Sequence, residues 1–265
     1  MCGIVGYIGP KETTEVLVEG LRRLEYRGYD SAGIAVVDDR GELELRRAAG
    51  KLRDLEKVLV ESPAHGRFGL GHTRWATHGR PTEENAHPHR DCSGNLVVIH
   101  NGIIENYLEL KKELEEQGHT FVTETDTEIV AHLIREALED GAEDLFEAVR
   151  ETVERLQGAY ALAVVSPDDP NCVITARAGC PVVLGVGFGE NFVASDVAAL
   201  LPVTRRFIFL EEGDLARLTR EGSEIRDREG NLVDRPITES ELVADAMDRG
   251  RYRHFMQKEI HEQPG

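Results

Sequence analysis

The chain has 265 residues, a formal net charge of -18 and 40% apolar residues, so it can bury one large core or two modest ones. The acidity argues against a nucleic-acid partner, which needs a basic patch, and no apolar run is long enough to cross a membrane. The cysteines at positions 2, 92, 172 and 180 lack CxxC spacing, which argues against a disulfide framework or zinc ribbon and favours a reducing, cytoplasmic setting.

The first apolar run, residues 1–9, predicts a strand. It lacks a basic region and is broken by Gly6, Gly9 and Pro10, so it is not typical of a signal peptide. The patterns that follow predict, in chain order, a helix (12–24), a strand (34–37), its hairpin partner (42–46) and a second helix (52–59).

A long polar stretch with the only tryptophan of the chain comes next. We expect a strand that ends near Arg74, followed by a loop that runs to His89. A loop of this length in a compact domain is usually functional or disordered. The apolar run 96–99 then predicts a buried strand that ends at His100-Asn101-Gly102.

Helical periodicity dominates the middle of the chain. It predicts a helix over 106–117 that ends at Gly118, a helix over 129–138 capped by Asp126 or Thr127, and a helix over 144–156. Residues 120–123 are expected to be short and extended. Later runs predict strands over 160–165, 172–176, 182–186, 191–194, 206–210 and 214–218. Strands, then helices, then strands again indicate an α+β fold with packed sheets between helical layers.

The C-terminal part is different in composition. From Arg235 onward it is strongly charged and the strand pattern is lost, although 251–260 has helical character. We therefore expect one domain over residues 1–234 and a connector over 235–265 that leads to a further domain.

Cys2 is the strongest candidate nucleophile. Removal of Met1 would give Cys2 a free α-amine beside its thiol, and a neutral amine can take the thiol proton near neutral pH. No histidine is then required. The alternative is that Cys2 is a small apolar residue that opens a buried strand.

Other polar residues suit the same chemistry. Attack of a thiolate on an amide generates an oxyanion, which needs fixed donors such as the Asn101 side chain and the Gly102 backbone N–H. Arg74 suits an α-carboxylate and Asp126 suits an α-ammonium group. Taken singly, Arg74 could be an exposed strand-end residue and Asp126 a helix N-cap.

These motifs carry a family resemblance. The sequence resembles the glutamine amidotransferases with an N-terminal cysteine, which are N-terminal-nucleophile hydrolases, at Cys2-Gly3-Ile4-Val5-Gly6, His72-Thr73-Arg74, His100-Asn101-Gly102 and Thr125-Asp126. Further motifs, at 24–33, 74–79, 85–89, 209–214 and 252–260, are similar to the glutaminase half of the glutamine:fructose-6-phosphate aminotransferase family. The likeness runs from Cys2 to Gln263.

The resemblance implies a four-layer αββα sandwich with two antiparallel sheets, and glutamine hydrolysis through a glutamyl thioester on Cys2. It implies an oxyanion hole at Asn101 and Gly102, a Trp75 ammonia gate, and a glutamine pocket formed by Arg74, Thr77, His78, Gly102 and Asp126. No metal or cofactor is implied. Fructose 6-phosphate would bind to a sugar-phosphate isomerase half that this sequence lacks, and the full-length enzyme is expected to be a homodimer.

Three alternatives stay open. A Cys-His hydrolase could pair Cys2 with His72, His78 or His100, although that would not explain a terminal cysteine. A metal-binding module without catalytic activity could use His87, His89 and Cys92. Within the family, amidophosphoribosyltransferase and asparagine synthetase are the nearest competitors, and Trp75 and the charged C-terminal segment count against both.

Overall fold

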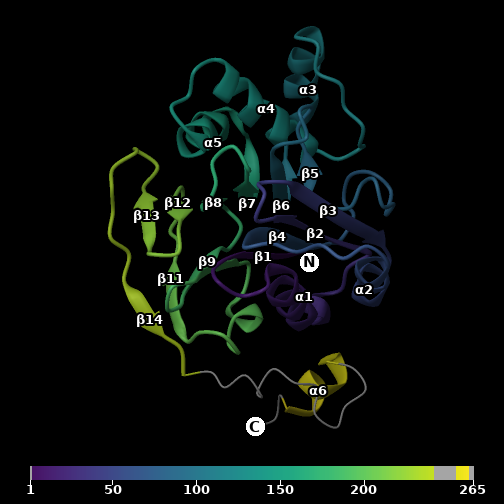
Figure 1. Cartoon of the computed structure of the whole chain (residues 1–265), viewed down its shortest axis with the longest axis vertical. Coiled ribbons are helices and arrows are strands. Elements are labelled where there is room, and N and C mark those ends of the chain that lie inside the picture. Colours follow the sequence, from purple (N-terminus) through teal and green to yellow (C-terminus); the bar gives the residue numbers. More distant parts are fainter. Residues whose placement is uncertain (1, 242–254, 263–265) are drawn as a thin grey trace.

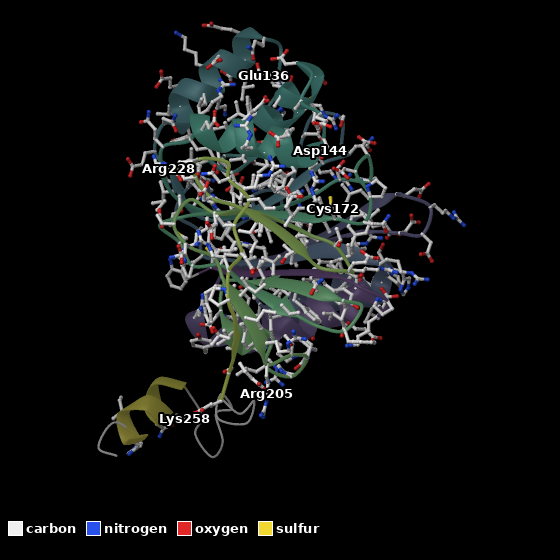
Figure 2. All side chains as sticks on the ribbon, turned by 90° about the vertical axis from the view of Figure 1, so that its left-hand side faces the viewer. Glu136, Asp144, Cys172, Arg205, Arg228 and Lys258 are labelled. Atoms are coloured by element: carbon white, nitrogen blue, oxygen red, sulfur yellow. The ribbon has the colours of Figure 1, made fainter. Side chains whose placement is uncertain are left out.

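A computed structural model describes residues 2–241 and 255–262, and it shows two antiparallel sheets stacked face to face between helices. In Figure 1, helices α3, α4 and α5 lie on one side of the strands and helices α1 and α2 on the other. Figure 2 shows the same stacking from the side, with Glu136 in the upper helical layer and Arg205 near the opposite end. The α+β, four-layer αββα arrangement expected from the sequence is confirmed.

The first sheet has eight strands. Their spatial order is β14 (Ile237–Glu239), β11 (Arg206–Phe209), β9 (Val183–Val186), β10 (Asn191–Ala194), β1 (Gly3–Ile8), β4 (Phe68–Arg74), β2 (Ser31–Val37) and β3 (Leu43–Ala49). Helices α1 (Thr13–Leu24) and α2 (Leu52–Glu61) pack on its outer face. The short helices η1 (Glu25–Arg27) and η2 (Val197–Ala199) lie in connections between these elements.

The second sheet has six strands. Their spatial order is β13 (Ser223–Arg226), β12 (Leu215–Leu218), β8 (Val173–Ala178), β7 (Gly158–Val165), β6 (Val97–Ile104) and β5 (His89–Arg90). Its outer face is covered by α3 (Tyr107–Glu116), α4 (Glu128–Glu139) and α5 (Leu145–Arg155). The final described helix is α6 (Phe255–Glu262).

Strand alternation explains why both faces of the first sheet are apolar. On β1, Ile4 and Ile8 enter the core between the two sheets, whereas Val5 and Tyr7 join the core that includes Leu17 of α1. Successive side chains of a strand point to opposite faces, so a strand with both faces covered is buried throughout. No helix in the two described stretches is both long and apolar enough to cross a membrane.

Several element predictions need correction. Strand β6 does not end at residue 99 but continues to Ile104, because 97–104 pair along their whole length with β7. Strands β13 and β14 had not been expected, because both are short and lie at sheet edges. Of the C-terminal helical prediction, residues 251–254 lie outside the described residues.

The register of β1 positions the start of the chain. Gly3 pairs with Thr73 of β4, so Cys2 lies beside the end of that strand. On the other side, the Ile4 N–H donates to Ser195 Oγ at 3.0 Å and the Ser195 N–H donates to the Ile4 carbonyl at 3.1 Å. The first residues are thus held from both sides, which fixes where Cys2 can lie.

The stability of the chain depends on residues after 234, which include Arg235 and strand β14. Arg235 donates from Nε and Nη2 to the two carboxylate oxygens of Asp214, at 3.0 and 2.8 Å, and Asp214 is buried. A chain ending at residue 234 loses this pair and leaves Asp214 unpaired, so it should have a lower Tm than a chain ending at residue 241. Differential scanning calorimetry of both chains checks this. Arg235→Ala in the longer chain should reproduce part of the loss, and equal Tm values for the two truncated chains would contradict it.

Candidate active site

Cys2 precedes β1 and its sulfur is held by the backbone of the β4 end. The Trp75 N–H donates to Cys2 Sγ at 3.2 Å, and Sγ lies 3.7 Å from the Trp75 carbonyl oxygen. Burial raises the pKa of the Cys2 thiol, while the Trp75 N–H and the Arg74 charge act in the opposite direction. The thiol is therefore mainly protonated near neutral pH and needs a base to become a nucleophile. These contacts differ from those of a residue that only fills a core.

The Asn101 side chain connects Cys2 to the second sheet. Its Nδ2 donates to the Cys2 carbonyl oxygen at 3.3 Å, and its Oδ1 lies 2.9 Å from His72 Nε2. His72 is fully buried, and burial lowers its pKa to about 3. The imidazole is therefore neutral, and it must carry its proton on Nε2 to donate to Oδ1. This hydrogen bond directs the amide NH2 group of Asn101 toward Cys2.

Gly102 has a backbone conformation that other residues adopt only with strain. Its φ is +127°, and an added Cβ would lie 1.9 Å from the carbonyl oxygen of Ala159 on the neighbouring strand. A glycine is therefore required if β6 is to keep its pairing with β7 directly after Asn101. The expected oxyanion donors, Asn101 and Gly102, are adjacent in a strand rather than in a loop.

Arg74 is a buried cation without an acidic partner. Only 4% of the residue is exposed, and no carboxylate lies within 4.0 Å of its guanidinium group in the described part of the chain. Its Nη1 donates to the Arg80 carbonyl at 3.4 Å, and its Nη2 donates to the His78 carbonyl. Burial lowers the pKa of Arg74, which reflects the cost of holding this charge away from water. An anionic ligand would reduce that cost.

The loop after Arg74 carries three more predicted residues. Trp75 is 53% exposed, and its ring lies next to Gly28, where an added Cβ would be 3.2 Å away. Thr77 is exposed, and His78 packs edge-on against Tyr107 with ring centroids 5.2 Å apart. The loop therefore has its backbone fixed near Arg74 and Cys2, with the Trp75 ring largely in solvent.

Asp126 does not cap helix α4. Its Oδ2 accepts a hydrogen bond from the Ile104 N–H at 2.9 Å, and the N-cap residue is Thr127, which makes no side-chain cap bond. Of the two residues expected to cap the helix, Thr127 is therefore the N-cap, without a side-chain cap bond, and Asp126 is not. The bond to Ile104 places the Asp126 carboxylate two residues beyond Gly102 on β6. Its Oδ1 makes no hydrogen bond to the described residues.

Two of the three histidines proposed as partners of Cys2 are hydrogen-bonded elsewhere, and the third, His78, packs against Tyr107. His72 binds Asn101, and His100 Nδ1 lies 3.0 Å from Thr127 Oγ1. Among the described residues, both hydrogen-bond contacts of Cys2 Sγ are with the Trp75 backbone. The geometry therefore favours an amine base over a Cys-His pair. Of the predicted metal ligands, His87 and His89 pack edge-on with ring centroids 4.6 Å apart, but His89 Nε2 contacts Thr125 Oγ1 at 3.1 Å and His87 Nδ1 accepts from the His100 N–H at 3.3 Å, so these nitrogens have other partners.

Two residues with a positioning role were missed at the sequence level. His72 orients the Asn101 amide, although we had considered it only as a base. Asp30 accepts from the Ala76 N–H at 2.7 Å, and its own N–H donates to the Arg74 carbonyl at 2.8 Å, so it fixes the loop after β4. Both residues lie in motifs that carry the family resemblance, but only the pairing of β2 with β4 and the stacking of the sheets show which groups they contact.

Comparison with known proteins agrees with this geometry. Residues 72–202 match the family described as glutamine amidotransferase domain. The chain is 55% identical over 264 residues to proteins named glutamine–fructose-6-phosphate aminotransferase (isomerizing) from Shigella flexneri and from Escherichia coli strain K12. Each match covers 100% of this chain and 43% of the relative. The chain thus spans less than half the length of these curated relatives.

Solved structures show a related fold. Glutamine phosphoribosylpyrophosphate amidotransferase from B. subtilis superposes with a TM-score of 0.74 at 29% identity, over 87% of this chain and 50% of that one. A glutamine aminotransferase class-II domain protein from Silicibacter pomeroyi has a TM-score of 0.57 at 20% identity, covering 85% of this chain and 99% of that one, which supports the fold alone.

The buried histidines around Asn101 predict a loss of stability in mild acid. Burial lowers the pKa of His72 and His89 to about 3, and also lowers the pKa of His87 and His100. Below the unfolded value of about 6.5, the unfolded chain binds protons that the folded chain does not, so stability is lost as the pH falls. Each such histidine should lower the free energy of unfolding by up to about 1.4 kcal/mol per pH unit.

Urea unfolding at several pH values between 8 and 5 measures this slope. The range stays above the pKa of ordinary carboxyl groups, so histidines dominate it. Equal stability at pH 7.5 and pH 5 would be inconsistent with four neutral, buried imidazoles.

Proposed function

This chain belongs to the class II glutamine amidotransferases, and on that premise we propose that Cys2 hydrolyses glutamine through a γ-glutamyl thioester. The convergence of the Cys2 thiol, the Asn101 amide and the unpaired Arg74 guanidinium group supports this function best. Together they offer a nucleophile, an oxyanion donor and an anion-binding group at one end of β1.

Substrate binding would use the two charged ends of a free amino acid. Arg74 is buried and lacks a carboxylate partner, so the substrate α-carboxylate is a suitable counterion. Asp126 has one oxygen bound to the Ile104 N–H, and its Oδ1 remains available to the α-ammonium group. Thr77 and His78, on the loop that Arg74 holds, and Gly102, next to Asn101, would complete the glutamine site.

The reaction would proceed in two steps. After Met1 has been removed, the free α-amine of Cys2 takes the thiol proton and Sγ attacks the side-chain amide carbon of glutamine. The tetrahedral intermediate collapses, the amine returns the proton to the leaving nitrogen, and ammonia departs from a thioester. Water, deprotonated by the same amine, then attacks the thioester. Glutamate leaves, and the sulfur regains its proton.

The oxyanion would be stabilised by donors that are already in place. Asn101 Nδ2 has two N–H bonds, one of which points to the Cys2 carbonyl, and His72 fixes the orientation of the amide. The Gly102 N–H follows directly in the strand. Donors oriented in advance need no reorganisation when negative charge develops, which is why such sites contribute strongly to catalysis.

Ammonia released in this way would be used by a second domain. We propose that residues 1–234 form the core of the glutaminase domain, that β14 adds an edge strand to it, and that the chain after β14 leads to a sugar-phosphate isomerase domain that aminates fructose 6-phosphate. The full-length enzyme would be a homodimer, and Trp75, whose ring is largely exposed, would gate the passage of ammonia. A reducing cytoplasm suits this chemistry, because the nucleophile must remain a free thiol and all four cysteines are unpaired.

A different acceptor reaction has weaker support. The amidotransferase domain of a phosphoribosylpyrophosphate amidotransferase has the same fold at 29% identity, whereas the aminotransferase relatives are 55% identical along the whole chain. The glutaminase step would be common to both. The difference lies in the acceptor, and we therefore favour fructose 6-phosphate.

Replacing the nucleophile tests the glutaminase function. Cys2→Ala should abolish glutamate release from glutamine, because no other thiol can form the thioester, and circular dichroism should show that the fold is retained. Cys172→Ala is a matched control. That thiol is also buried, its pKa is raised to about 12 by burial, and its loss should leave turnover unchanged. Activity that persists in Cys2→Ala would exclude the mechanism.

Blocking the α-amine of Cys2 tests whether this amine is the base. An uncleaved residue placed before Cys2 converts the amine to an amide, which cannot accept the proton, so turnover should fall to background while the thiol remains present. Intact mass spectrometry establishes which form was assayed. Full activity of the extended chain would show that another group is the base.

The oxyanion role predicts a large kinetic effect at Asn101. Asn101→Ala should lower kcat by roughly a hundredfold or more, in line with the loss of one oxyanion donor, with a much smaller change in KM. Asn191→Ala is a suitable control, because Asn191 of β10 is also buried and its side chain donates to the Thr219 backbone carbonyl at 2.6 Å. A less than threefold fall in kcat for Asn101→Ala would mean that the donor is assigned wrongly.

A further inference from the structure

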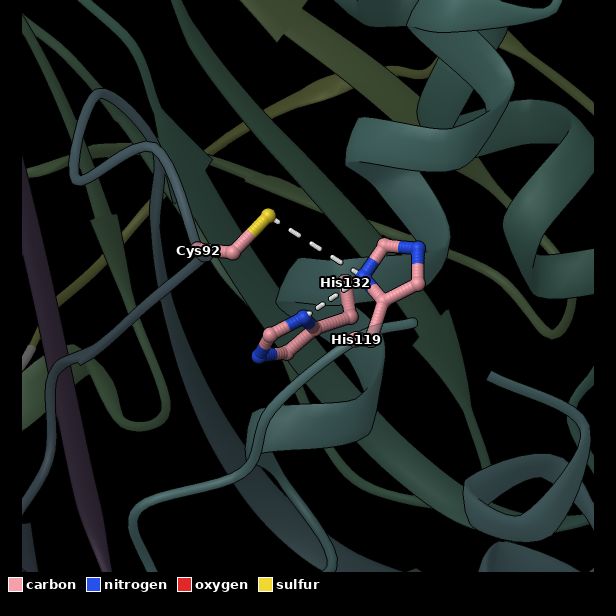
Figure 3. Close-up of side chains that lie close together, drawn as sticks. All are labelled: Cys92, His119 and His132. Atoms are coloured by element: carbon pink, nitrogen blue, oxygen red, sulfur yellow. Dashed lines mark hydrogen bonds between the residues drawn. The ribbon is translucent and has the colours of Figure 1, made fainter. Parts of the chain in front are cut away.

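A second group of nucleophilic and titratable side chains lies outside the active site. Cys92 follows β5, His119 follows α3, and His132 is on α4, and Figure 3 shows the three side chains pointing toward one another. His119 Nδ1 lies 2.9 Å from His132 Nδ1 and 4.0 Å from Cys92 Sγ. One ligand atom from each residue falls within 4.8 Å of the other two.

This set matches the preferences of a zinc-like ion. Zn²⁺ binds cysteine sulfur at about 2.3 Å and histidine nitrogen at about 2.0–2.1 Å in tetrahedral geometry, which places its ligand atoms roughly 3.3–3.6 Å apart. The His119–His132 and Cys92–His119 contacts, at 2.9 and 4.0 Å, lie on either side of this value, and all three ligand atoms lie within 4.8 Å of one another, so side-chain shifts of about one ångström would satisfy all three bonds.

The surroundings also resemble a metal site. His132 Nε2, the nitrogen that faces away from the cluster, lies 3.8 Å from Glu128 Oε1, and both residues are buried. Histidines that bind metals commonly have their second nitrogen next to a carboxylate, which fixes the ring orientation. Cys92 is exposed, so an ion and a water ligand can reach the site from solvent.

We propose that Cys92, His119 and His132 bind one divalent zinc-like ion, with water as the fourth ligand. This set of ligands was not expected from the sequence, because the three residues are separated by 27 and 13 positions and match no short motif. Of the earlier metal hypothesis, only Cys92 is retained.

The ion would connect three separate segments. It would tie the turn after β5 and the start of the α3–α4 connection to helix α4. The same connection is held further along by Glu128, which accepts hydrogen bonds from the Val122 and Thr123 N–H groups at 2.9 and 2.8 Å. Asp126 lies at the end of this connection. The role of the ion is therefore structural, and it stabilises the segment that carries Asp126.

Cobalt binding tests the site directly. The assay uses the Cys2→Ala variant, because the terminal thiol and amine could themselves chelate a metal. After removal of bound metal with a chelator, Co²⁺ should bind one to one and give a sulfur-to-cobalt charge-transfer band and the visible bands of tetrahedral cobalt. Cys92→Ser and His119→Ala in this background should lose these bands.

Matched controls and a stability readout complete the test. Cys180→Ser and His65→Ala remove a cysteine and a histidine outside the cluster and should retain the bands. Zn²⁺ at about 100 times its Kd should raise the Tm of the parent by roughly 5 °C or more and leave that of Cys92→Ser unchanged. Absence of the charge-transfer band, or its persistence in Cys92→Ser, would overturn the proposal. So would equal Tm shifts in both proteins.

Discussion

The hydrogen bond between His72 and Asn101 is the contact on which the site depends, because it joins the two sheets where the chain begins. His72 belongs to β4 of the first sheet and Asn101 to β6 of the second, and their side chains meet at 2.9 Å. The donor and acceptor roles in this bond are fixed, because the neutral imidazole of His72 must donate to the amide oxygen of Asn101. The Asn101 NH2 group is thereby directed to Cys2, so the proposed catalysis would depend on a contact between the two sheets.

Burial affects the charges around this contact in two ways. It keeps His72 neutral, which makes the histidine useful for orientation and unsuited to act as a base near neutral pH. It also raises the pKa of Cys2, and it leaves Arg74 as a buried cation that forms no ion pair with the described residues. Such a charge is unfavourable without a counterion, and a bound anionic substrate would relieve it. This cost would favour the proposed recognition of a carboxylate.

The elements with clear periodicity could be predicted from the sequence, and those set by tertiary contacts could not. The first apolar run identified β1, and the apolar stripe identified α4. The continuation of β6 through Asn101 and Gly102 was missed because polar residues and a glycine normally end a strand, whereas here β7 pairs with them and the Ala159 carbonyl requires a glycine. The site motifs identified Cys2, Arg74, Asn101 and Asp126, but the function of His72 depends on how the sheets stack.

The proposed site has rigid and adjustable parts. Cys2, the proposed nucleophile, and Asn101, the proposed oxyanion donor, are attached to strands that are hydrogen-bonded on both sides, so the distance between these two residues is set by the stacking of the sheets. Asp126 is different, because one side of its carboxylate is bound to β6 through Ile104, while its backbone belongs to the α3–α4 connection. An ion at Cys92, His119 and His132 would restrain that connection from its other end. The spacing between Asp126 and Arg74, and with it the fit of an amino acid, would then depend on a metal that takes no part in the chemistry.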